Sequence, residues 1–331
     1  MRAMALLGDD SRLTAVERPD PVPGPGEVAL KVSACGVCRT DLHIADGDLP
    51  RLRPGIVPGH EIVGTVAALG AGVTALRLGE RVGVPWLGGV CGVCPYCAEG
   101  AENLCDAPVF TGWTRDGGYA EACTADARFC VKLPEALEDA VAAPLLCAGL
   151  IGFRAWRMAA AARPVKRLGL YGFGAAAHLL TQLAVHEGQR VHAFTKPGDA
   201  AGQTFARRLG CVWAGGADEM PPEMLDAAIL FAPAGELVPR ALKAVRKGGT
   251  VVCGGIHMSD IPSFPYADLW GERRIVSVAN LTREDAALYL PRAAAAGVRP
   301  TVTRYALADA NRALADLSDG RIEGAGVLVM S

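Results

Sequence analysis

Two hydrophobic patterns divide the chain. Between residues 11 and 81, short runs rich in Val and Ala, such as Glu27–Val32 and Glu61–Leu69, are broken by Pro and Gly. Runs of this kind predict an antiparallel β barrel or sandwich. From Arg167 onward, apolar strand-like runs alternate with turns and helical stretches. This alternation predicts a doubly wound parallel sheet with helices on both faces.

The strand-like runs of the second part are short and mostly apolar. The first, Leu168–Tyr171, leads to Gly172, and a run rich in Ala and Leu continues to about Glu187. The stretch Gly326–Met330 has a strand-like pattern again, so we expect it to return to the first domain. The remaining predicted strands are Arg190–Phe194, Ala227–Phe231, Thr250–Cys253 and Ile275–Val278.

Length and composition indicate a globular protein of two domains. The chain has 331 residues, of which 51% are hydrophobic and 21% charged. Such a chain buries enough apolar surface to exclude disorder. With 33 Lys and Arg against 35 Asp and Glu, the formal net charge is −2. We therefore expect no nucleic-acid partner and no attraction to an anionic membrane.

Neither a membrane span nor a secretion signal is predicted. The longest uncharged apolar run, Ala140–Phe153, is too short to cross a bilayer and is interrupted by Pro144. Asp9 and Asp10 follow the first residues before an apolar signal core could form. We expect a cytoplasmic protein whose 11 cysteines are thiols, because a reducing compartment disfavours disulfides.

Four closely spaced cysteines form the most specific motif. Cys91, Cys94, Cys97 and Cys105 follow the pattern C-x2-C-x2-C-x7-C on a loop that contains Gly and Pro. Unrelated buried cysteines would not share this spacing. Four thiolates can surround a tetrahedral Zn²⁺ and leave no open position, so we predict a structural zinc site.

A second set of metal-binding residue types, Cys38, His60 and Cys147, is dispersed along the chain. Taken singly, each is more often a core cysteine or a buried histidine than a ligand. Together they have the composition of a catalytic Cys2His zinc site, in which the fourth position is left for water or substrate. Spacing alone does not unite them, so both interpretations stay open at this point.

Several motifs occur in a particular order: Cys38–His43, Gly59–Glu61, the four-cysteine loop, Asp116–Glu121, Cys147 and the turn at Gly172. This order resembles that of the zinc-dependent medium-chain alcohol dehydrogenases. The resemblance implies a GroES-like, β-rich catalytic domain built from residues 1–149 and 286–331, with a structural zinc lobe at about 88–107. It also implies a Rossmann dinucleotide-binding domain at 150–285, and hence an α/β fold class.

The same resemblance implies roles around a catalytic zinc. Cys38, His60 and Cys147 would be the ligands. Asp41 would orient the imidazole of His60, as such partner carboxylates do. Glu61 would lie beneath the metal. A turn cap for Asp41 and an ordinary buried ion pair for Glu61 are the alternatives.

A proton relay is implied as well. Zinc in such a site holds the alcohol oxygen and lowers its pKa, so that hydride can pass to nicotinamide. The resemblance implies that the proton leaves through the Thr40 hydroxyl, the cofactor ribose and His43 at the surface. A helix N-cap is the alternative role for Thr40.

The turn at Gly172 resembles a dinucleotide-binding fingerprint. It follows a predicted strand and opens a predicted helix, and Gly174 is placed to let the backbone approach a pyrophosphate. Ala177 takes the place of the third glycine. Arg39 would meet the pyrophosphate alone, because the family's C-terminal Gly-Arg appears here as Gly324–Ala325.

Cofactor preference is expected at the end of the second strand of this sheet. A carboxylate there favours NAD, whereas Thr195 followed by Lys196 suits the 2′-phosphate of NADP. We therefore expect NADP(H) to be favoured over NAD(H), together with two Zn²⁺ per chain. Asp199 would reverse this preference if its side chain reached the ribose.

Aromatic residues near Cys91 indicate a substrate pocket. Trp86 lies where relatives place aromatic substrate contacts, and Leu49 stands where the narrow ethanol-type enzymes carry tryptophan. Phe110 and Trp113 would extend the wall. We expect medium-chain or benzylic primary alcohols and their aldehydes as substrates, and an aromatic cluster within the core is the alternative.

Other functions remain to be weighed against this one. A zinc-free enoyl or quinone reductase of the same fold would lack these ligands. A polyol, threonine or formaldehyde dehydrogenase would share the zinc chemistry and differ in the pocket. A non-enzymatic zinc or redox-sensing protein would leave Thr40 and His43 unexplained. The resemblance further implies a homo-oligomer, either a tetramer or a dimer.

Overall fold

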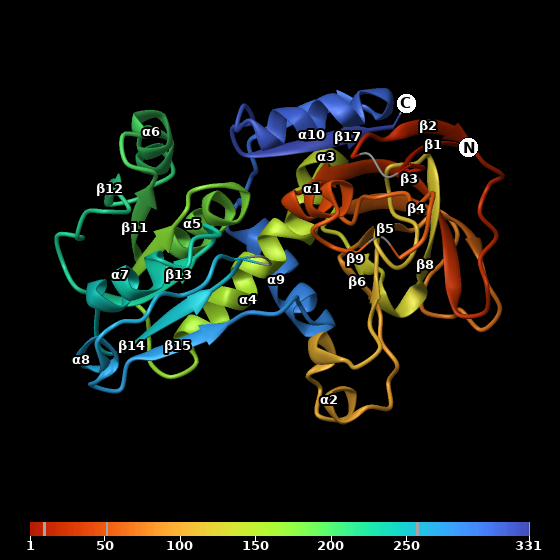
Figure 1. Cartoon of the computed structure of the whole chain (residues 1–331). Coiled ribbons are helices and arrows are strands. Elements are labelled where there is room, and N and C mark those ends of the chain that lie inside the picture. The colour runs from red at the N-terminus through yellow and green to blue at the C-terminus, as the bar shows by residue number, and fades with distance from the viewer. Residues whose placement is uncertain (9–10, 51, 256–257, 331) are drawn as a thin grey trace. The chain divides into compact units, whose positions relative to one another are not determined.

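The computed structural model describes residues 1–331 except 9–10, 51, 256–257 and 331 (Figure 1). The described residues cluster into two compact units. The β-rich unit comprises Met1–Ala148, Asn280–Ala294 and Arg299–Ser331, and the α/β unit comprises Gly149–Ala279 and Ala295–Val298. Segments from both halves of the chain therefore build the β-rich unit.

The main sheet of the β-rich unit is organised around one long strand, β3 (Glu27–Val37). Along one edge of β3 runs β4 (Ile62–Leu69), antiparallel to it. The other edge is shared by β8 (Ala122–Asp126) and β17 (Ala325–Val329). The predicted strand near residue 330 thus pairs with an early strand. The sheet continues with β16 (Val302–Ala306) beside β17, and with β5 (Arg81–Val84) and β9 (Val131–Lys132) beyond β4.

The core of this unit explains why β3 and β4 form. Alternate residues of β3, Val28, Leu30 and Val32, are buried in one hydrophobic cluster, as the two-residue period of a strand requires. Cys35 of β3 lies opposite Ile62 of β4 in the antiparallel ladder. The end of β3 and the start of β4 therefore lie at the same end of the strands. The loops at this end carry Cys38 and His60.

Smaller elements complete the β-rich unit. β1 (Arg2–Ala5) pairs with β2 (Thr14–Glu17), and β6 (Leu87–Gly89) pairs with β7 (Val109–Phe110). The helices are α1 (Arg39–Asp46), α2 (Pro95–Ala98), α3 (Asp139–Ala142), α9 (Arg283–Ala295) and α10 (Ala310–Ser318). The 3-10 turns are η1 (Glu102–Leu104), η2 (Ala127–Phe129), η3 (Ala143–Leu146) and η4 (Leu307–Asp309).

The α/β unit is built on a parallel sheet with the strand order β12-β11-β10-β13-β14-β15. Counted from β10, this is the order 3-2-1-4-5-6 of a doubly wound dinucleotide-binding sheet. The predicted fold class is therefore confirmed. The strands are β10 (Arg167–Tyr171), β11 (Arg190–Thr195), β12 (Trp213–Gly216), β13 (Leu225–Leu230), β14 (Val245–Cys253) and β15 (Arg274–Ser277).

Helices accompany this sheet in the order expected of βαβ units (Figure 1). Every residue of the central strand β13 is buried, which is the pattern of a strand covered on both faces. The helices are α4 (Ala148–Ala160), α5 (Ala175–His186), α6 (Ala200–Arg208), α7 (Leu237–Ala244) and α8 (Tyr266–Leu269).

Membrane-spanning potential is confined to one bent helix pair. In the part of the chain that the structure describes, no single helix has the length and hydropathy needed to cross a bilayer, and only Asp139–Leu146 taken together with Ala148–Ala160 reaches both.

Candidate metal centres and active site

The four-cysteine loop folds into a compact cluster. The sulfur atoms of Cys91, Cys94, Cys97 and Cys105 all lie within 4.8 Å of one another. Local sequence explains the turn, since Gly92 adopts a φ of 75° and a proline occupies the start of α2 directly after Cys94. The structure thus brings together the four residues that the spacing united.

Backbone amides surround these sulfur atoms. The N–H of Cys94 donates to Cys91 Sγ at 3.4 Å, and the N–H of Cys91 donates to Cys105 Sγ at 3.3 Å. Backbone donors from Val93 and Cys94, together with the Cys105 thiol, lower the pKa of Cys91 to about 6. A thiolate is the form that binds metal, so this cluster fits a four-thiolate zinc ion.

The dispersed set also converges, at the edge where β3 ends and β4 begins. Ligand atoms of Cys38, His60, Glu61 and Cys147 all lie within 4.8 Å of one another, and the sulfur atoms of Cys38 and Cys147 are 3.9 Å apart. Cys38 directly follows β3, His60 precedes β4, and Cys147 follows η3. Two thiols and an imidazole on one centre match the donors of a catalytic zinc site.

His60 is suited to hold a metal through Nε2. The side chain is fully buried, and Nε2 has no hydrogen-bond partner among the described residues. On the other side of the ring, Nδ1 lies 3.3 Å from Oδ1 of Asp41. A buried polar atom with no partner is costly, so an Nε2 that faces two thiols is a place where a metal would complete the structure.

The charge of each group in this cluster depends on its neighbours. A hydrogen bond from the Cys147 thiol lowers the pKa of Cys38 well below its ordinary value, and the same bond raises the pKa of Cys147. Burial, and next the Cys38 thiolate, raise the pKa of Glu61 well above its usual range. Glu61 packs against Gly36, where an added Cβ would collide with the carboxylate. Glu61 is therefore next to the ligand atoms, and among the described residues no Lys or Arg forms an ion pair with it.

Asp41 is the most tightly held carboxylate of the site. It lies in the first turn of α1 and is fully buried. It accepts hydrogen bonds from the backbone N–H of Cys38 at 2.9 Å and of Gly59 at 3.1 Å, and from the Tyr119 hydroxyl at 3.1 Å. The bond to Cys38 also caps the helix, so the alternative of a turn cap and the role of an imidazole partner coincide in one side chain. Sequence reasoning singled out the segment containing Tyr119 and gave this residue no role.

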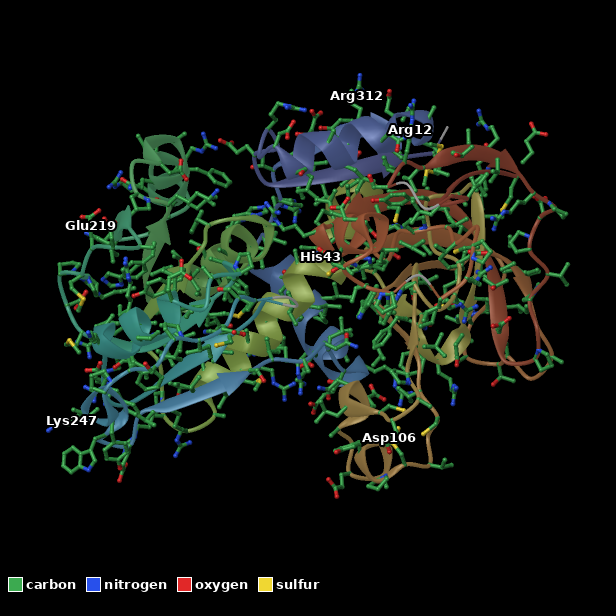
Figure 2. The ribbon with its side chains drawn as sticks, viewed as in Figure 1. Arg12, His43, Asp106, Glu219, Lys247 and Arg312 are labelled. Atoms are coloured by element: carbon green, nitrogen blue, oxygen red, sulfur yellow. The ribbon has the colours of Figure 1, made fainter. Side chains whose placement is uncertain are left out.

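The relay candidates lie on α1. Thr40 is buried, with its hydroxyl oxygen 3.7 Å from Cys38 Sγ. It is the second residue of the helix, and Cys38 occupies the N-cap, so Thr40 is not the cap. His43, labelled in Figure 2, is partly exposed, and its Nδ1 lies 2.8 Å from Oδ2 of Asp48. The sequence did not indicate that Asp48 is a partner of His43.

The predicted pocket residues form one aromatic stack that starts at His60. The ring of Trp86 meets the imidazole edge-on, with centroids 5.0 Å apart, and stacks on Phe110 at 4.9 Å and on Trp113 at 6.0 Å. Leu49 is partly buried beside the same cluster. Trp86 is buried and packs with the core, whereas Phe110 and Trp113 are only partly buried. Trp86 therefore belongs to the core, and the pocket role of Phe110 and Trp113 stays a prediction.

The glycine turn of the α/β unit has the shape that the fingerprint requires. Gly172, directly after β10, adopts a φ of 87°, and a Cβ there would lie 2.7 Å from the backbone nitrogen of Ala232. Gly174 is the N-cap of α5, and a Cβ built on it would meet no atom within 4 Å. Ala177 is buried in α5. Open space at a helix N-terminus fits the pyrophosphate of a dinucleotide.

The residues expected to choose the cofactor differ in orientation. Thr195 ends β11 but is only 3% exposed, and its hydroxyl donates to the backbone oxygen of Lys196 at 3.2 Å. Lys196 itself is exposed. Asp199 caps α6 by accepting from the N–H of Gly202 at 2.8 Å. Arg39 is an exposed residue at the start of α1, in the β-rich unit.

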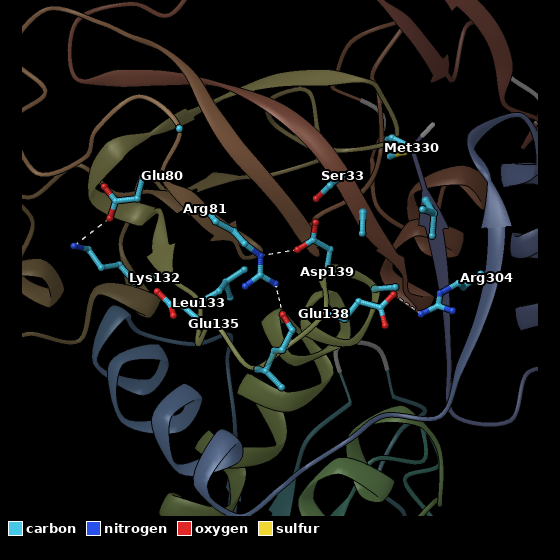
Figure 3. A pocket seen from close by; sticks show the side chains of 15 residues that line it. Ser33, Glu80, Arg81, Lys132, Leu133, Glu135, Glu138, Asp139, Arg304 and Met330 are labelled. Carbon is cyan, nitrogen blue, oxygen red and sulfur yellow. Dashed lines mark hydrogen bonds and ion pairs between the residues drawn. The ribbon is translucent and has the colours of Figure 1, made fainter.

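A surface hollow of about 950 Å³ lies elsewhere on the β-rich unit (Figure 3). Most of its charged lining residues pair with one another: Lys132 pairs with Glu80 at 3.1 Å, and Arg304 with Glu138 at 2.6 Å. Arg81 pairs with Asp139 in the same way. None of the predicted site residues lines this hollow, so its chemistry is separate from that of the metal clusters.

Comparison with known proteins agrees with this geometry. Residues 24–135 match the family described as the alcohol dehydrogenase GroES-like domain. The chain is 47% identical over 328 residues to a probable alcohol dehydrogenase, AdhA, of Mycobacterium tuberculosis (strain CDC 1551 / Oshkosh), a match that covers 97% of this chain and 94% of that protein.

Solved structures with the same fold extend over almost the whole chain. A cinnamyl alcohol dehydrogenase of Sorghum bicolor superimposes with a TM-score of 0.90 at 27% identity, covering 99% of this chain and 97% of that one. The acetophenone reductase of Geotrichum candidum NBRC 4597, in complex with NAD, gives 0.87 at 29% identity, with 99% and 96% covered. The chain belongs to the zinc-type medium-chain alcohol dehydrogenase family and is an oxidoreductase of that class.

Proposed function

We propose that this protein is a zinc-dependent alcohol dehydrogenase and aldehyde reductase that interconverts primary alcohols, medium-chain or benzylic, with their aldehydes by using NADP(H). The observation that carries the proposal is the convergence of Cys38, Cys147 and the unpartnered Nε2 of His60 on one centre. The β-rich unit would be the catalytic domain, and the α/β unit the dinucleotide-binding domain.

Two metal sites with different tasks follow from the donor sets. Cys91, Cys94, Cys97 and Cys105 leave no open position and would hold a structural zinc. Cys38, His60 and Cys147 would hold a second zinc, which supplies a Lewis acid to an alcohol or carbonyl oxygen when it is bound. Asp41 keeps the imidazole in the orientation that presents Nε2.

The remaining chemistry is proton movement by side chains of α1. The Thr40 hydroxyl lies beside the Cys38 sulfur, where it can accept the proton of a substrate hydroxyl. His43, one turn further along α1, is partly exposed and is held by Asp48. An imidazole can both accept and donate a proton, so His43 is suited to exchange that proton with water.

The aromatic stack supports the substrate class. Phe110 and Trp113 continue the Trp86 ring away from the imidazole as parallel faces. Leu49 adds aliphatic surface beside them. Flat apolar faces next to a metal centre favour an alkyl chain or an aromatic ring over the two carbons of ethanol, because each buried methylene contributes about 0.8 kcal/mol.

NADP(H) is supported by what surrounds the end of β11. Lys196 is exposed and cationic there. The Asp199 carboxylate is occupied as the cap of α6, so it does not offer the ribose the acceptor that NAD enzymes provide. Thr195 contributes shape rather than a hydrogen bond, because its hydroxyl is turned to the backbone.

We further propose a homo-oligomer, a dimer or a tetramer, assembled through the α/β unit. β15 is an edge strand of the sheet, and the nearby side chains of Ile261, Tyr266 and Trp270 are exposed by 46%, 72% and 61%. An unpaired strand edge flanked by exposed aromatic rings is suited to a second copy. The 11 free thiols support a reducing, cytoplasmic setting.

Initial rates test the function. Purified protein is mixed with NADPH or NADH and acetaldehyde, hexanal or benzaldehyde, with and without prior removal of metal by a chelator. We expect metal-dependent turnover that is faster with NADPH and with the larger aldehydes. Metal-dependent turnover with NADH alone would overturn the cofactor, and turnover of polyols, threonine or formaldehyde adducts instead would overturn the substrate class.

A further inference from the structure

Tyr119 connects two parts of the catalytic cluster without being a ligand. Its side chain is fully buried, and its hydroxyl donates to Oδ2 of Asp41 at 3.1 Å. Burial, and next the Asp41 carboxylate, raise the pKa of Tyr119 well above its usual range. The phenol therefore stays protonated and remains a donor.

The ring of Tyr119 also presses on the backbone before His60. Gly59 has a φ of 97°, and a Cβ there would lie 2.4 Å from Cδ1 of Tyr119. The backbone N–H of Tyr119 donates to the oxygen of Pro58 at 3.0 Å, and its own oxygen accepts from the N–H of Met4 at 2.8 Å. The ring and the backbone of Tyr119 are thus both held against the Pro58–Gly59 segment, which determines the position of the His60 backbone.

Each oxygen of Asp41 has a separate set of partners. Oδ1 faces Gly59 N–H and His60 Nδ1, and Oδ2 accepts from Cys38 N–H and from the Tyr119 hydroxyl. Removing the phenol leaves Oδ2 with one donor in a fully buried place, where water cannot replace the other. The carboxylate is then free to rotate, and the imidazole that it orients loses its fixed direction.

We propose that Tyr119 is a positioning residue for the catalytic metal: through Asp41 and Gly59 it fixes the direction of His60 Nε2 and so strengthens metal binding at the Cys38–His60–Cys147 centre. This inference rests on the proposed catalytic site. It assigns the Asp116–Glu121 motif a role in metal retention.

The test compares Tyr119→Phe with the loss of the hydroxyl from another tyrosine of the same unit. Phe keeps the ring that packs on Gly59 and removes only the hydroxyl. Tyr305→Phe is the control, because the Tyr305 hydroxyl donates to Asp316 at 2.9 Å in the same unit. Zinc release from each fully loaded chain is followed with a colorimetric chelator, in which the metals of the two centres appear as separate phases. Cys147→Ala identifies the phase that belongs to the catalytic centre.

We expect Y119F to release the catalytic-site zinc about tenfold faster, the lower end of the range for groups behind metal ligands. Y305F should match the unmodified chain, and the four-cysteine phase should be unchanged in both. Cobalt in place of zinc gives a second readout, because a rotated imidazole changes the visible absorption of the catalytic-site ion. If Tyr119 contributes only through the packing of its ring, Y119F would change neither the rate of zinc release nor the cobalt absorption.

A double substitution tests the route through Asp41. If Tyr119 acts through this carboxylate, the effect of Y119F on zinc release should largely vanish in an Asp41→Asn background. A measurement on the unmodified chain does not require any variant to fold. In this chain, the buried hydroxyl proton of Tyr119 should give a slowly exchanging NMR signal that shifts when zinc is removed.

The outcomes separate the two proposals. Release from Y119F at the unmodified rate, or a hydroxyl signal indifferent to zinc, overturns the role of Tyr119 alone. An unmodified chain that binds a single zinc, undiminished by Cys147→Ala, overturns the proposed catalytic centre and this inference together.

Discussion

Arg283, the first residue of α9, binds Glu102, which lies 181 residues earlier within the four-cysteine loop. The backbone N–H of Arg283 donates to Glu102 Oε1 at 2.7 Å, and the guanidinium donates to Oε2 at 2.6 and 2.9 Å. Its guanidinium also lies over the ring of Phe129 at 4.9 Å. The four-cysteine loop is thereby connected to the rest of the β-rich unit by an arginine that contacts both a carboxylate and an aromatic face.

Arg283→Ala should loosen this loop. The Glu102 side chain is only 10% exposed, so losing its partner leaves a carboxylate nearly out of water and costs about 2 kcal/mol of folding stability. Urea unfolding measures the loss. Arg163→Ala, which breaks an exposed pair with Glu272, is the control and should cost less than about 0.5 kcal/mol. Equal losses from the two variants would contradict the fastening role.

Single cysteine substitutions should remove one metal each. Cys147→Ala is expected to keep one zinc per chain and its fold while losing alcohol turnover, because only the catalytic donor set is broken. Cys94→Ala is expected to lose the other zinc and to lower the thermal midpoint, because a structural zinc contributes folding free energy. Metal analysis and thermal unfolding check both. Loss of both metals from either variant would argue against independent centres.

Trp86→Ala should change which substrates are preferred. The ring next to His60 provides apolar surface to a bound benzyl group and little to ethanol, so kcat/KM for benzyl alcohol should fall about tenfold or more while that for ethanol changes less. Trp270→Ala, an exposed indole of the α/β unit, is the matched control and should leave the ratio unchanged. A uniform loss across ethanol, hexanol and benzyl alcohol would mean that Trp86 supports the core and not the pocket.

Lys196→Ala should weaken NADPH selectively. A charge-assisted contact to the 2′-phosphate contributes about 1.5–3 kcal/mol, so KM for NADPH should rise by roughly 10- to 100-fold with little effect on NADH. Lys247, labelled in Figure 2, is exposed near the start of β14 and so lies at the opposite end of the parallel strands from the end of β11. Lys247→Ala is therefore the control. Parallel changes for both cofactors would remove Lys196 from cofactor choice.

Asp226 should stabilise the α/β unit in a pH-dependent way. Burial opposes its charge, but hydrogen bonds from Arg167, Arg246 and two backbone amides hold its pKa well below the usual range. A depressed carboxyl pKa contributes stability that is complete above the unfolded value of about 3.9 and is lost as pH falls below it. Asp226→Asn should therefore cost about 2–3 kcal/mol at pH 7 and progressively less below about pH 4.

Urea unfolding at several pH values measures this difference. Asp218→Asn is the control, because Asp218 is exposed just after β12, the edge strand of the same sheet. It should have no comparable effect at any pH. An Asp226→Asn deficit that stays constant down to pH 2 would show that shape, and not charge, is what the position requires.

The sequence predicts those parts of the site whose residues lie close together in the chain. The spacing of Cys91, Cys94 and Cys97 indicates a shared metal because a short loop can close on one centre, and a glycine turn after a strand indicates a dinucleotide site. Cys38 and Cys147 are 109 residues apart, so only the family resemblance suggested that they meet. Their convergence depends on the packing of η3 against β3, which no local pattern reveals.

Side-chain direction accounts for what the sequence did not predict. Thr195 stands at the expected position, but its hydroxyl turns to the backbone, and Asp199 is withdrawn by the N-terminus of α6. The Tyr119 hydroxyl contacts Asp41, which is 78 residues away in the sequence, and His43 contacts Asp48, five residues further along the chain. Each of these contacts is set by rotamers within a packed structure, and residue identity alone does not determine them.

The place of β17 has a consequence for how the chain acquires its structure during synthesis. Among the described strands, the second half of the β3 edge that β8 and β17 share pairs only with β17, which is made after the whole of Gly149–Ala279. The α/β unit, continuous over that range, can therefore complete its fold while the older unit still shows an unpaired strand edge to the cell. During that interval the end of β3 lacks its partner strand, and a chain that stops before β17 would leave that edge open to pairing with other chains.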